Sequence, residues 1–325
     1  MKPHLYPHKF CVAPMMSYTD TFERQFLRNF SKHVLLYTEM VTCQALIYGD
    51  KQRLLRFTKH EHPVALQLGG NDPDSLVTCA KIAEDYGFDE VNLNVGCPSS
   101  RVQAGAFGLY MLQHPELVAE CLNKMQQAVN IPVTLKTRIG VDEQDSYQHL
   151  HNVIQMVEQV GIKHIWLHAR KGWLNGLSPK ENRTVPPLNY QMVYDIKRDF
   201  PKLYIGINGG IQTVEDTVQH LKIVDGVMLG RAAYHDPYLI HKLENSLYAQ
   251  DSTLQTRTQI MENFLPQLET ILENGVYFSK VKPHLMGLFY NTTYAKLWKK
   301  SLSAITKETT NIIPTIRTLL SKISE

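Results

Sequence analysis

The sequence predicts an α/β protein in which a (β/α)8 TIM barrel is followed by a smaller all-α helical domain. Eight short runs rich in β-branched and aromatic residues recur along the first 235 residues, with helical patterns between most of them. After about residue 245 this alternation stops and only helical patterns follow. We therefore expect a barrel in residues 1–245 and a helical domain in residues 246–325.

The eight runs are the predicted strands of the barrel. In chain order they are FCVAPM (10–15), LLYTEM (35–40), PVALQLG (63–69), EVNLNV (90–95), PVTLKTRI (132–139), HIWLHAR (164–170), YIGINGG (204–210) and GVMLGRA (226–232). An open doubly wound sheet is the alternative. That fold usually carries a GxGxxG turn after its first strand, where this chain has MMSYTD (15–20).

Helix boundaries can be placed at several points between and after these strands. Asp72-Pro73 begins one helix that Gly87 ends, Pro115 begins another, and Thr213 caps a third. Apolar residues at helical spacing fill 150–160 before Gly161. In the tail we expect helices over 254–272, 285–290, 294–302 and 312–323.

Composition limits the class of protein. Of the 325 residues, 43% are hydrophobic and 20% charged, which is ordinary for a globular protein. No apolar run has the length of a membrane span, and the first ten residues lack the apolar core of a signal peptide. We expect a cytoplasmic protein with no membrane association. Its five cysteines have no CxxC spacing, which argues against a disulfide framework or a structural zinc site.

The charge is unevenly distributed. From Val281 to the end there are seven Lys or Arg and two Glu, whereas the first 280 residues carry 27 basic and 29 acidic residues. On charge alone, a solvated helical face is the simpler interpretation. The other interpretation is a segment that binds a polyanion.

Polar residues recur where the predicted strands end. In a barrel of this kind the carboxyl ends of the strands converge on one mouth, which holds the active site. Each residue alone has an ordinary structural explanation, but an amide, a lysine and a histidine on neighbouring strands together indicate a polar ligand. The set is Gln67, Asn94, Cys97, Lys136, Arg138, His168, Arg170, Asn208, Gly209, Gly210, Gly230 and Arg231.

The glycines indicate the kind of ligand. Asn208-Gly209-Gly210 and Gly230-Arg231 follow strands seven and eight, which is the usual phosphate site of this fold. A phosphate there, with Lys136, His168 and Gln67 reaching inward, suits flavin mononucleotide (FMN). The rival interpretation is an aldolase in which Lys136 forms a Schiff base. That chemistry needs a desolvated lysine, whereas Arg138 and an expected anion lie near Lys136.

These motifs resemble those of one family, the tRNA-dihydrouridine synthases, over essentially the whole chain. The most specific part is NVGCPS, KTRIG, HAR and NGGI in that order, and the set is APMMSYTD (13–20), TEM (38–40), ALQLGG (65–70), NLNVGCPS (92–99), KTRIG (136–140), HAR (168–170), INGGI (207–211) and MLGRAAY (228–234). Two segments resemble the A-type bacterial subfamily more than the B or C types, namely LSPKENRTVPPL (177–188) and MGLFYNTTYAKLWKK (286–300).

The resemblance implies an FMN-dependent enzyme that reduces uridine to 5,6-dihydrouridine in the D-loop of tRNA, at positions 20 and 20a, with NADPH as reductant. It implies tRNA as partner, with no obligate protein partner evident. Cys97 matches the general acid of the family. Flavin-binding positions match Pro14, Met15, Met16, Ser17, Gln67, Lys136, His168, Asn208, Gly209, Gly210, Gly230 and Arg231. Positions that contact tRNA match Asn94, Lys180 and Arg183, and either Lys296 or Lys299 in the tail.

The chemistry explains a cysteine at the end of a strand. Reduction of the uracil 5,6 double bond needs a hydride at C6 and a proton at C5, and a thiol, with a pKa of about 8.5 in water, can donate that proton at neutral pH. Pro98 restricts Cys97 to extended or turn geometry. The alternatives are another FMN-dependent barrel oxidoreductase acting on a small pyrimidine, the aldolase, and a non-catalytic tRNA-binding protein.

Overall fold

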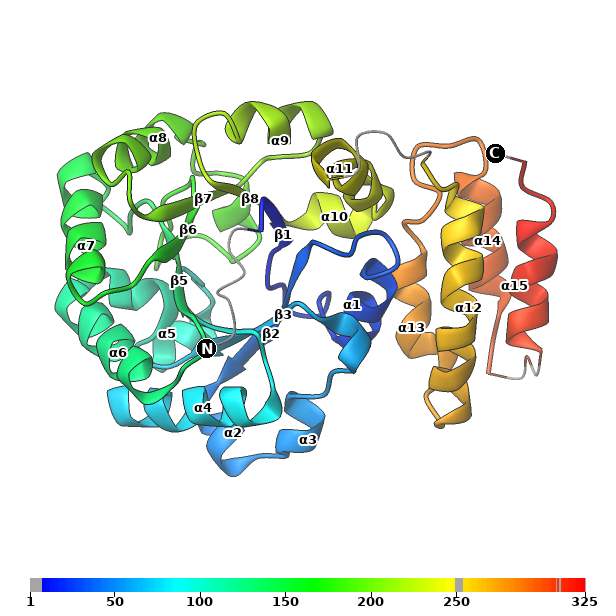
Figure 1. Cartoon of the computed structure of the whole chain (residues 1–325), viewed down its shortest axis with the longest axis horizontal. Helices are drawn as coiled ribbons and strands as arrows, with labels where there is room; N and C mark the ends of the chain where they lie inside the picture. The colour runs from blue at the N-terminus through cyan, green and yellow to red at the C-terminus, as the bar shows by residue number, and fades with distance from the viewer. Residues whose placement is uncertain (1–7, 249–253, 308, 310, 325) are drawn as a thin grey trace.

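The computed structural model describes residues 8–248, 254–307, 309 and 311–324. Within them, eight parallel strands close into a barrel, each paired with its neighbours in chain order (Figure 1). The strands are β1 (Phe10–Val12), β2 (Leu35–Thr42), β3 (Val64–Gly69), β4 (Glu90–Val95), β5 (Val133–Arg138), β6 (His164–His168), β7 (Tyr204–Asn208) and β8 (Gly226–Leu229). The predicted fold class is therefore confirmed.

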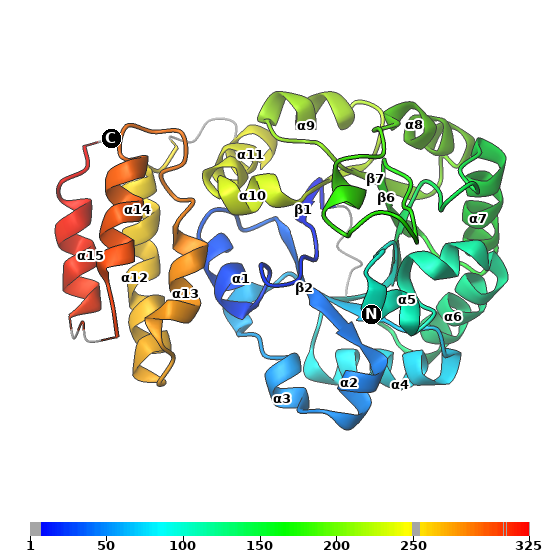
Figure 2. The ribbon, with the colours of Figure 1, turned by 180° about the vertical axis from the view of Figure 1, so that it is seen from behind.

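Helices surround the barrel on its outside, as the two opposite views show (Figures 1 and 2). They are α1 (Thr21–Leu27), α2 (Cys43–Tyr48), α3 (Lys51–Leu54), α4 (Pro73–Tyr86), α5 (Ser100–Ala104), α6 (Pro115–Ala128), α7 (Tyr147–Gln159), α8 (Tyr190–Asp199), α9 (Val214–His220), α10 (Arg231–His235) and α11 (Tyr238–Tyr248). Three 3₁₀ turns lie in the loops, η1 (Lys59–Glu61), η2 (Gly108–Gln113) and η3 (Glu181–Arg183).

The helix boundaries predicted from capping residues are confirmed. The Asp72 side chain accepts a hydrogen bond from Ser75 N at the start of α4, and Gly87 ends that helix at a φ of +90°. Thr213 caps α9 by accepting from Asp216 N. Six of the eight strands are one to three residues shorter than predicted, largely because their last residues turn into the loops that carry the functional groups.

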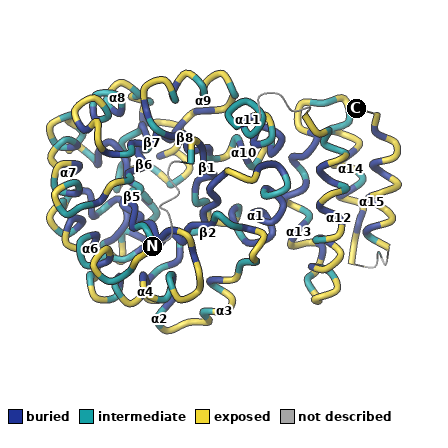
Figure 3. Tube along the Cα trace, in the orientation of Figure 1, coloured by how far each residue is buried: buried dark blue, intermediate teal, exposed yellow. Residues whose placement is uncertain are grey.

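Buried side chains form two layers, one between the strands and the helices and one inside the barrel. The trace coloured by burial shows the strands as largely buried (Figure 3). The inner layer is small and includes Tyr37, Trp166 and Met228, with Tyr204 packed against it. Glycines make room for its aromatic rings. A Cβ on Gly206 would lie 2.1 Å from the Trp166 ring, and one on Gly226 would lie 1.8 Å from the Tyr204 hydroxyl.

The helical part consists of α12 (Arg257–Glu273), α13 (Phe278–Leu285), α14 (Ala295–Ala304) and α15 (Ile312–Leu320), beside the barrel (Figure 1). Three of the four predicted tail helices are confirmed. The expected helix over 285–290 is wrong, because that segment follows α13 as a turn. Gly287 there approaches the backbone closely, and a Cβ on it would lie 2.7 Å from His235 O.

One charged cluster lies where the helical part meets the barrel. The His284 ring of α13 is buried between two carboxylates, with Nε2 3.2 Å from Asp20 Oδ1 and Nδ1 3.2 Å from Glu23 Oε2. Asp20 also caps α1 by accepting from Phe22 N. Burial alone would lower the pKa of His284, but the two carboxylates outweigh it and raise that pKa to about 9.

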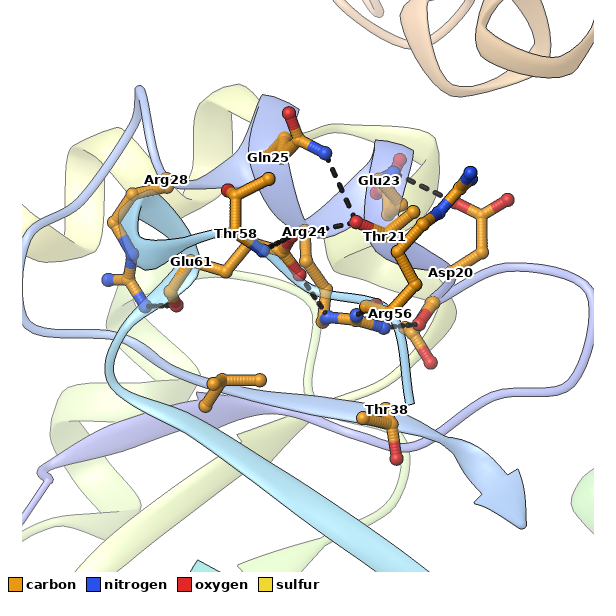
Figure 4. A network of polar contacts seen from close by, with 12 residues as sticks. Asp20, Thr21, Glu23, Arg24, Gln25, Arg28, Thr38, Arg56, Thr58 and Glu61 are labelled. Carbon is orange, nitrogen blue, oxygen red and sulfur yellow. Dashed lines mark hydrogen bonds and ion pairs between the residues drawn. The ribbon is translucent and has the colours of Figure 1, made fainter. Parts of the chain in front are cut away.

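A second buried network holds the loop after β1 against η1 (Figure 4). Arg24 Nε donates to Glu61 Oε2 at 2.7 Å, and Arg24 Nη1 donates to Thr19 O at 2.7 Å. Glu61 also accepts from the Thr21 hydroxyl. The buried polar atoms of Arg24 and Glu61 have hydrogen-bond partners, so this ion pair fixes the loop that leaves β1 toward the barrel mouth.

No helix among the described residues is long and apolar enough to cross a membrane. The predicted domain boundary at residue 245 falls near the end of α11, and it stays a prediction.

Candidate active site

Strand register brings the predicted site residues together at the carboxyl ends of the strands. Asn94 of β4 pairs with Lys136 of β5, and His168 of β6 pairs with Asn208 of β7. Gln67 Oε1 accepts from Asn94 Nδ2 at 2.8 Å, which joins β3 to the same group. One amide, one ammonium and one imidazole therefore share the mouth, as the sequence predicts.

Cys97 lies just beyond β4 at this mouth. Its backbone N–H donates to Asn94 Oδ1 at 3.0 Å, and its carbonyl accepts from Leu109 N at 3.0 Å. The thiol is partly exposed and lies 3.6 Å from the Ser99 hydroxyl. Gly108 has a φ of +63° and a Cβ there would lie 2.8 Å from Cys97 O, so only glycine lets η2 close over the cysteine. The four other cysteines are buried.

Two basic groups at the mouth are desolvated. Burial lowers the pKa of Lys136 to about 8, and the charge of Arg138 adds to the effect. The pKa of His168 is well below its usual value, because of burial and then of Arg138, Lys136 and Arg170, so this ring is neutral at pH 7. Both side chains keep some accessible surface yet lie deep among neighbouring atoms. The expectation that Lys136 is not desolvated is therefore wrong.

The glycine turns after β7 and β8 have different causes. Gly209 has a φ of +119° and a Cβ there would lie 2.8 Å from the His168 ring, so packing against protein explains it. At Gly230, the nearest heavy atom to a Cβ is Met15 Sδ at 4.0 Å. Nothing in the protein requires glycine there on grounds of space. Such an open backbone, directly before α10 and Arg231, fits close approach by a phosphate.

The loop after β1 lies next to the Gly230 turn at this mouth, because β1 pairs with β8. Met15 packs against the inner layer of the barrel, and Met16 is 58% exposed. Ser17 has a φ of +64°, and its backbone N–H donates to Glu39 Oε1 at 2.5 Å. Glu39 inside β2 thus holds the predicted flavin loop, a role that the sequence did not reveal.

The loop after β6 carries Lys180 and Arg183, both exposed. Asn182 between them is fully buried, and its side chain accepts from Trp173 N at 2.7 Å. Arg138 donates to Asn182 O at 3.0 Å and to Gly96 O at 2.9 Å. This buried guanidinium therefore joins the cysteine loop to the basic loop. The role of Arg138 was not evident from sequence, because Gly96 and Asn182 lie more than forty residues away from it.

Lys296 and Lys299 lie outside the barrel mouth, on α14 of the helical part. Both are exposed, and with Lys300 they line a hollow in its surface. Trp298, buried on the other side of α14, anchors this helix through Nε1, which donates to Leu285 O at 2.8 Å. The structure does not bring these lysines together with the other predicted site residues.

No group of three or more His, Cys, Asp or Glu side chains within the described ranges could hold a metal ion. The predicted polar side chains at the barrel mouth are instead cationic or neutral. The turn at Gly230 leaves space next to its backbone. Such donors fit an anionic, phosphorylated ligand with a polar ring.

The fold defines a class, the closed eight-stranded (β/α)8 barrels, here with a helical part after the barrel. Solved structures with this fold include morphinone reductase (TM-score 0.52, 11% identity, 73% of this chain and 86% of that one). An old yellow enzyme homologue from Zymomonas mobilis is similar (TM-score 0.53, 12% identity, 74% and 89%). At such identities the likeness shows the fold alone.

Sequence comparison is more specific. The sequence model described as "Dihydrouridine synthase (Dus)" matches residues 11–324. A tRNA-dihydrouridine(20/20a) synthase of Synechocystis sp. is 52% identical over 90% of this chain and 87% of its own length. One of Vibrio vulnificus is 47% identical over 97% and 96%. The chain belongs to the dihydrouridine synthase family.

Proposed function

We propose that this protein is a flavin-dependent tRNA-dihydrouridine synthase that reduces uridine in the D-loop of tRNA. The observation that carries the proposal is the placement of Cys97, Asn94 and Lys136 around one barrel mouth in a chain of this family. The relatives are named (20/20a) synthases, which supports positions 20 and 20a as the target.

The residues at the mouth suit flavin mononucleotide. Its phosphate would lie at Gly210, Gly230 and Arg231, and its ring would contact Lys136 and His168. When bound and reduced, with NADPH as the proposed reductant, the flavin supplies the hydride that adds to C6 of uracil. The loop of Pro14, Met15 and Met16 would cover the ring. A Schiff-base aldolase would also use a desolvated lysine, but the family membership favours the flavin.

Cys97 then donates its thiol proton to C5 of the uracil ring. Arg138 holds the backbone beside this thiol, because its Nε donates to Gly96 O at 2.9 Å. Asn94 uses one amide hydrogen on Gln67 and has a second for a carbonyl of the base. These groups bind and orient a pyrimidine that has left its stack, which costs a few kcal/mol.

Contacts to tRNA phosphates offset that cost. We propose that Lys180 and Arg183 hold the strand next to the flipped base, and that residues 246–325 form a tRNA-binding domain contacting the backbone through Lys296 and Lys299. A tRNA substrate and the absence of a membrane-spanning helix among the described residues support a cytoplasmic location.

The test uses purified protein, an unmodified tRNA transcript and NADPH, with dihydrouridine mapped by mass spectrometry. Cys97→Ala should retain flavin and bind tRNA but form no product, whereas Cys121→Ala, which removes a buried thiol, should remain active. Full activity of Cys97→Ala contradicts the acid role. Reduction of free uracil or orotate, without tRNA product, would instead favour an oxidoreductase acting on a small pyrimidine.

A further inference from the structure

A line of hydrogen-bonded side chains runs inside the barrel below the proposed site. Asn92 of β4 is paired in register with Thr134 of β5, and both are fully buried. Asn92 Nδ2 donates to Thr134 Oγ1 at 2.8 Å, and that hydroxyl donates to Glu90 Oε1 at 2.6 Å. None of these three residues touches the mouth, yet all are polar in a part of the barrel where apolar side chains would be expected.

The same line continues upward to the cysteine loop. Gln67 Nε2 donates to Asn92 Oδ1 at 2.8 Å, and Asn94 Nδ2 donates to Gln67 Oε1 at 2.8 Å. Asn94 Oδ1 then accepts the backbone N–H groups of Gly96 and Cys97 at 3.2 and 3.0 Å. Every link joins a donor to an acceptor without a gap from Cys97 down to Glu90.

The two ends of this line require the same direction of donation. At the top, the backbone N–H groups of Gly96 and Cys97 can only donate, so the oxygen of Asn94 must face them. At the bottom, Glu90 Oε1 accepts, so the Thr134 hydroxyl must give its hydrogen downward and receive one from Asn92. The amides of Gln67 and Asn94 consequently have one orientation each.

The lower end is itself fixed by the aromatic layer. The Tyr37 hydroxyl donates to Glu90 Oε1, and Trp166 Nε1 donates to the Tyr37 hydroxyl at 2.9 Å. Because an indole N–H only donates, the hydroxyl hydrogen of Tyr37 is directed to Glu90. The direction of the hydrogen bonds in this line is therefore fixed at its lower end by the packed aromatic side chains inside the barrel.

We propose that Glu90, Thr134 and Asn92 are positioning residues that set the amide orientation of Gln67 and Asn94, and through Asn94 the backbone of Cys97. This inference rests on the proposed function. Asn94 is 8% exposed, and with its oxygen held by the cysteine loop its second amide hydrogen is the group left for the pyrimidine. A reversed amide would oppose two N–H groups and present an oxygen to the base instead.

The experiment breaks the line at Thr134, far from the reacting atoms. Thr134→Val has nearly the same shape but neither accepts from Asn92 nor donates to Glu90. Thr134→Ser restores both bonds. Thr137→Val is the matched control, since Thr137 is equally buried on the same strand and donates to Val95 O outside the line.

Two measurements are made on each full-length variant. The first is hydrogen exchange of the Gly96 and Cys97 amides, resolved by residue, which needs no substrate. We expect Thr134→Val to speed this exchange about tenfold, and Thr134→Ser and Thr137→Val to leave it within about twofold. The second is kinetics with bound flavin. Thr134→Val should slow uridine reduction tenfold or more while reduction of the flavin by NADPH stays within about twofold.

Equal exchange in Thr134→Val and Thr137→Val would overturn the proposal, and so would equal slowing of both half-reactions. If Thr134→Val does not fold, Asn92→Asp takes its place, because it keeps the acceptor for Gln67 but offers Thr134 an oxygen. Wild-type protein that forms no dihydrouridine would refute the proposed function, whereas the exchange measurement would still decide the positioning role.

Discussion

The buried His284 cluster predicts a specific dependence of stability on pH. The pKa of this ring rises from 6.5 to about 9 in the folded protein. Each pKa unit corresponds to about 1.4 kcal/mol, so charged His284 contributes up to about 3 kcal/mol to the junction between α13 and α1. Because the folded pKa is raised, this contribution is complete below pH 6.5 and is lost as the pH rises through 9.

The neighbouring carboxylates titrate at lower pH than His284. Burial raises the pKa of Glu23 to about 7, so stability linked to Glu23 is lost between about pH 4.5 and 7. The pKa of Asp20 is lowered despite its burial, through hydrogen bonds and the charge of His284, so Asp20 stays ionised above pH 4. Above pH 7 the remaining ionisation of Glu23 changes stability by only about 0.4 kcal/mol, so most of the change in this cluster between pH 7 and 9.5 belongs to His284.

Urea unfolding followed by circular dichroism at pH 7.0 and 9.5 measures the effect. The wild type should lose about 2 kcal/mol more stability across this interval than His284→Gln. His220→Gln is the control, since His220 is also buried but its pKa is lowered by burial, so that variant should behave like the wild type. An equal loss in wild type and His284→Gln would refute the role assigned to this ring.

Three further predictions concern the mouth and the tail. Lys136→Met should weaken flavin binding by about 10- to 100-fold, which is the contribution of a charge-assisted hydrogen bond. Binding of flavin to the wild type should likewise weaken as the pH rises through about 8, where Lys136 loses its proton. Unchanged flavin absorbance of Lys136→Met after gel filtration would contradict this role of Lys136. Gly230→Ala should lower flavin affinity about tenfold or more while the melting temperature shifts by only a few degrees, because the added methyl group would contact the ligand rather than the protein. A flavin affinity equal to that of the wild type would exclude a phosphate at this turn. The double variant Lys296→Glu, Lys299→Glu should raise the KM for tRNA about tenfold or more and leave NADPH oxidation unchanged. Equal effects on the KM for tRNA and on NADPH oxidation would argue against binding of tRNA to α14.

The order of the barrel could be predicted because its signals are local. Each strand is a short run bounded by turn residues, and caps such as Asp72 and Gly87 act within four residues of themselves. The mouth could be anticipated for the same reason, since the fold places every strand end there. The tail was predicted less well. The helix expected over 285–290 is a turn, because Gly287 packs against the backbone of α10, which lies about fifty residues earlier in the chain.

Groups whose partners are distant in sequence were not predicted. Arg138 looks like any arginine at a strand end until Gly96 and Asn182, 42 and 44 residues away, are placed around it. His284 looks like a surface histidine of a basic tail, and only the contact of α13 with α1 puts it between two carboxylates. In each case the decisive energy comes from pairing a buried polar group, which depends on what the rest of the chain brings to it.

The stretch EVNLNV shows most clearly why sequence gives the strand but not its purpose. Alternation of polar and apolar residues normally indicates a strand with one face in water. In β4 the polar face instead points into the barrel, where Glu90, Asn92 and Asn94 would each be costly if unpaired. Their partners come from β2, β3 and β5, and the two partners of Asn92 lie 25 and 42 residues away from it. Because those partners satisfy every link in one direction, the polar face becomes an ordered support for the cysteine loop. Its identity as a site component is a property of four strands together.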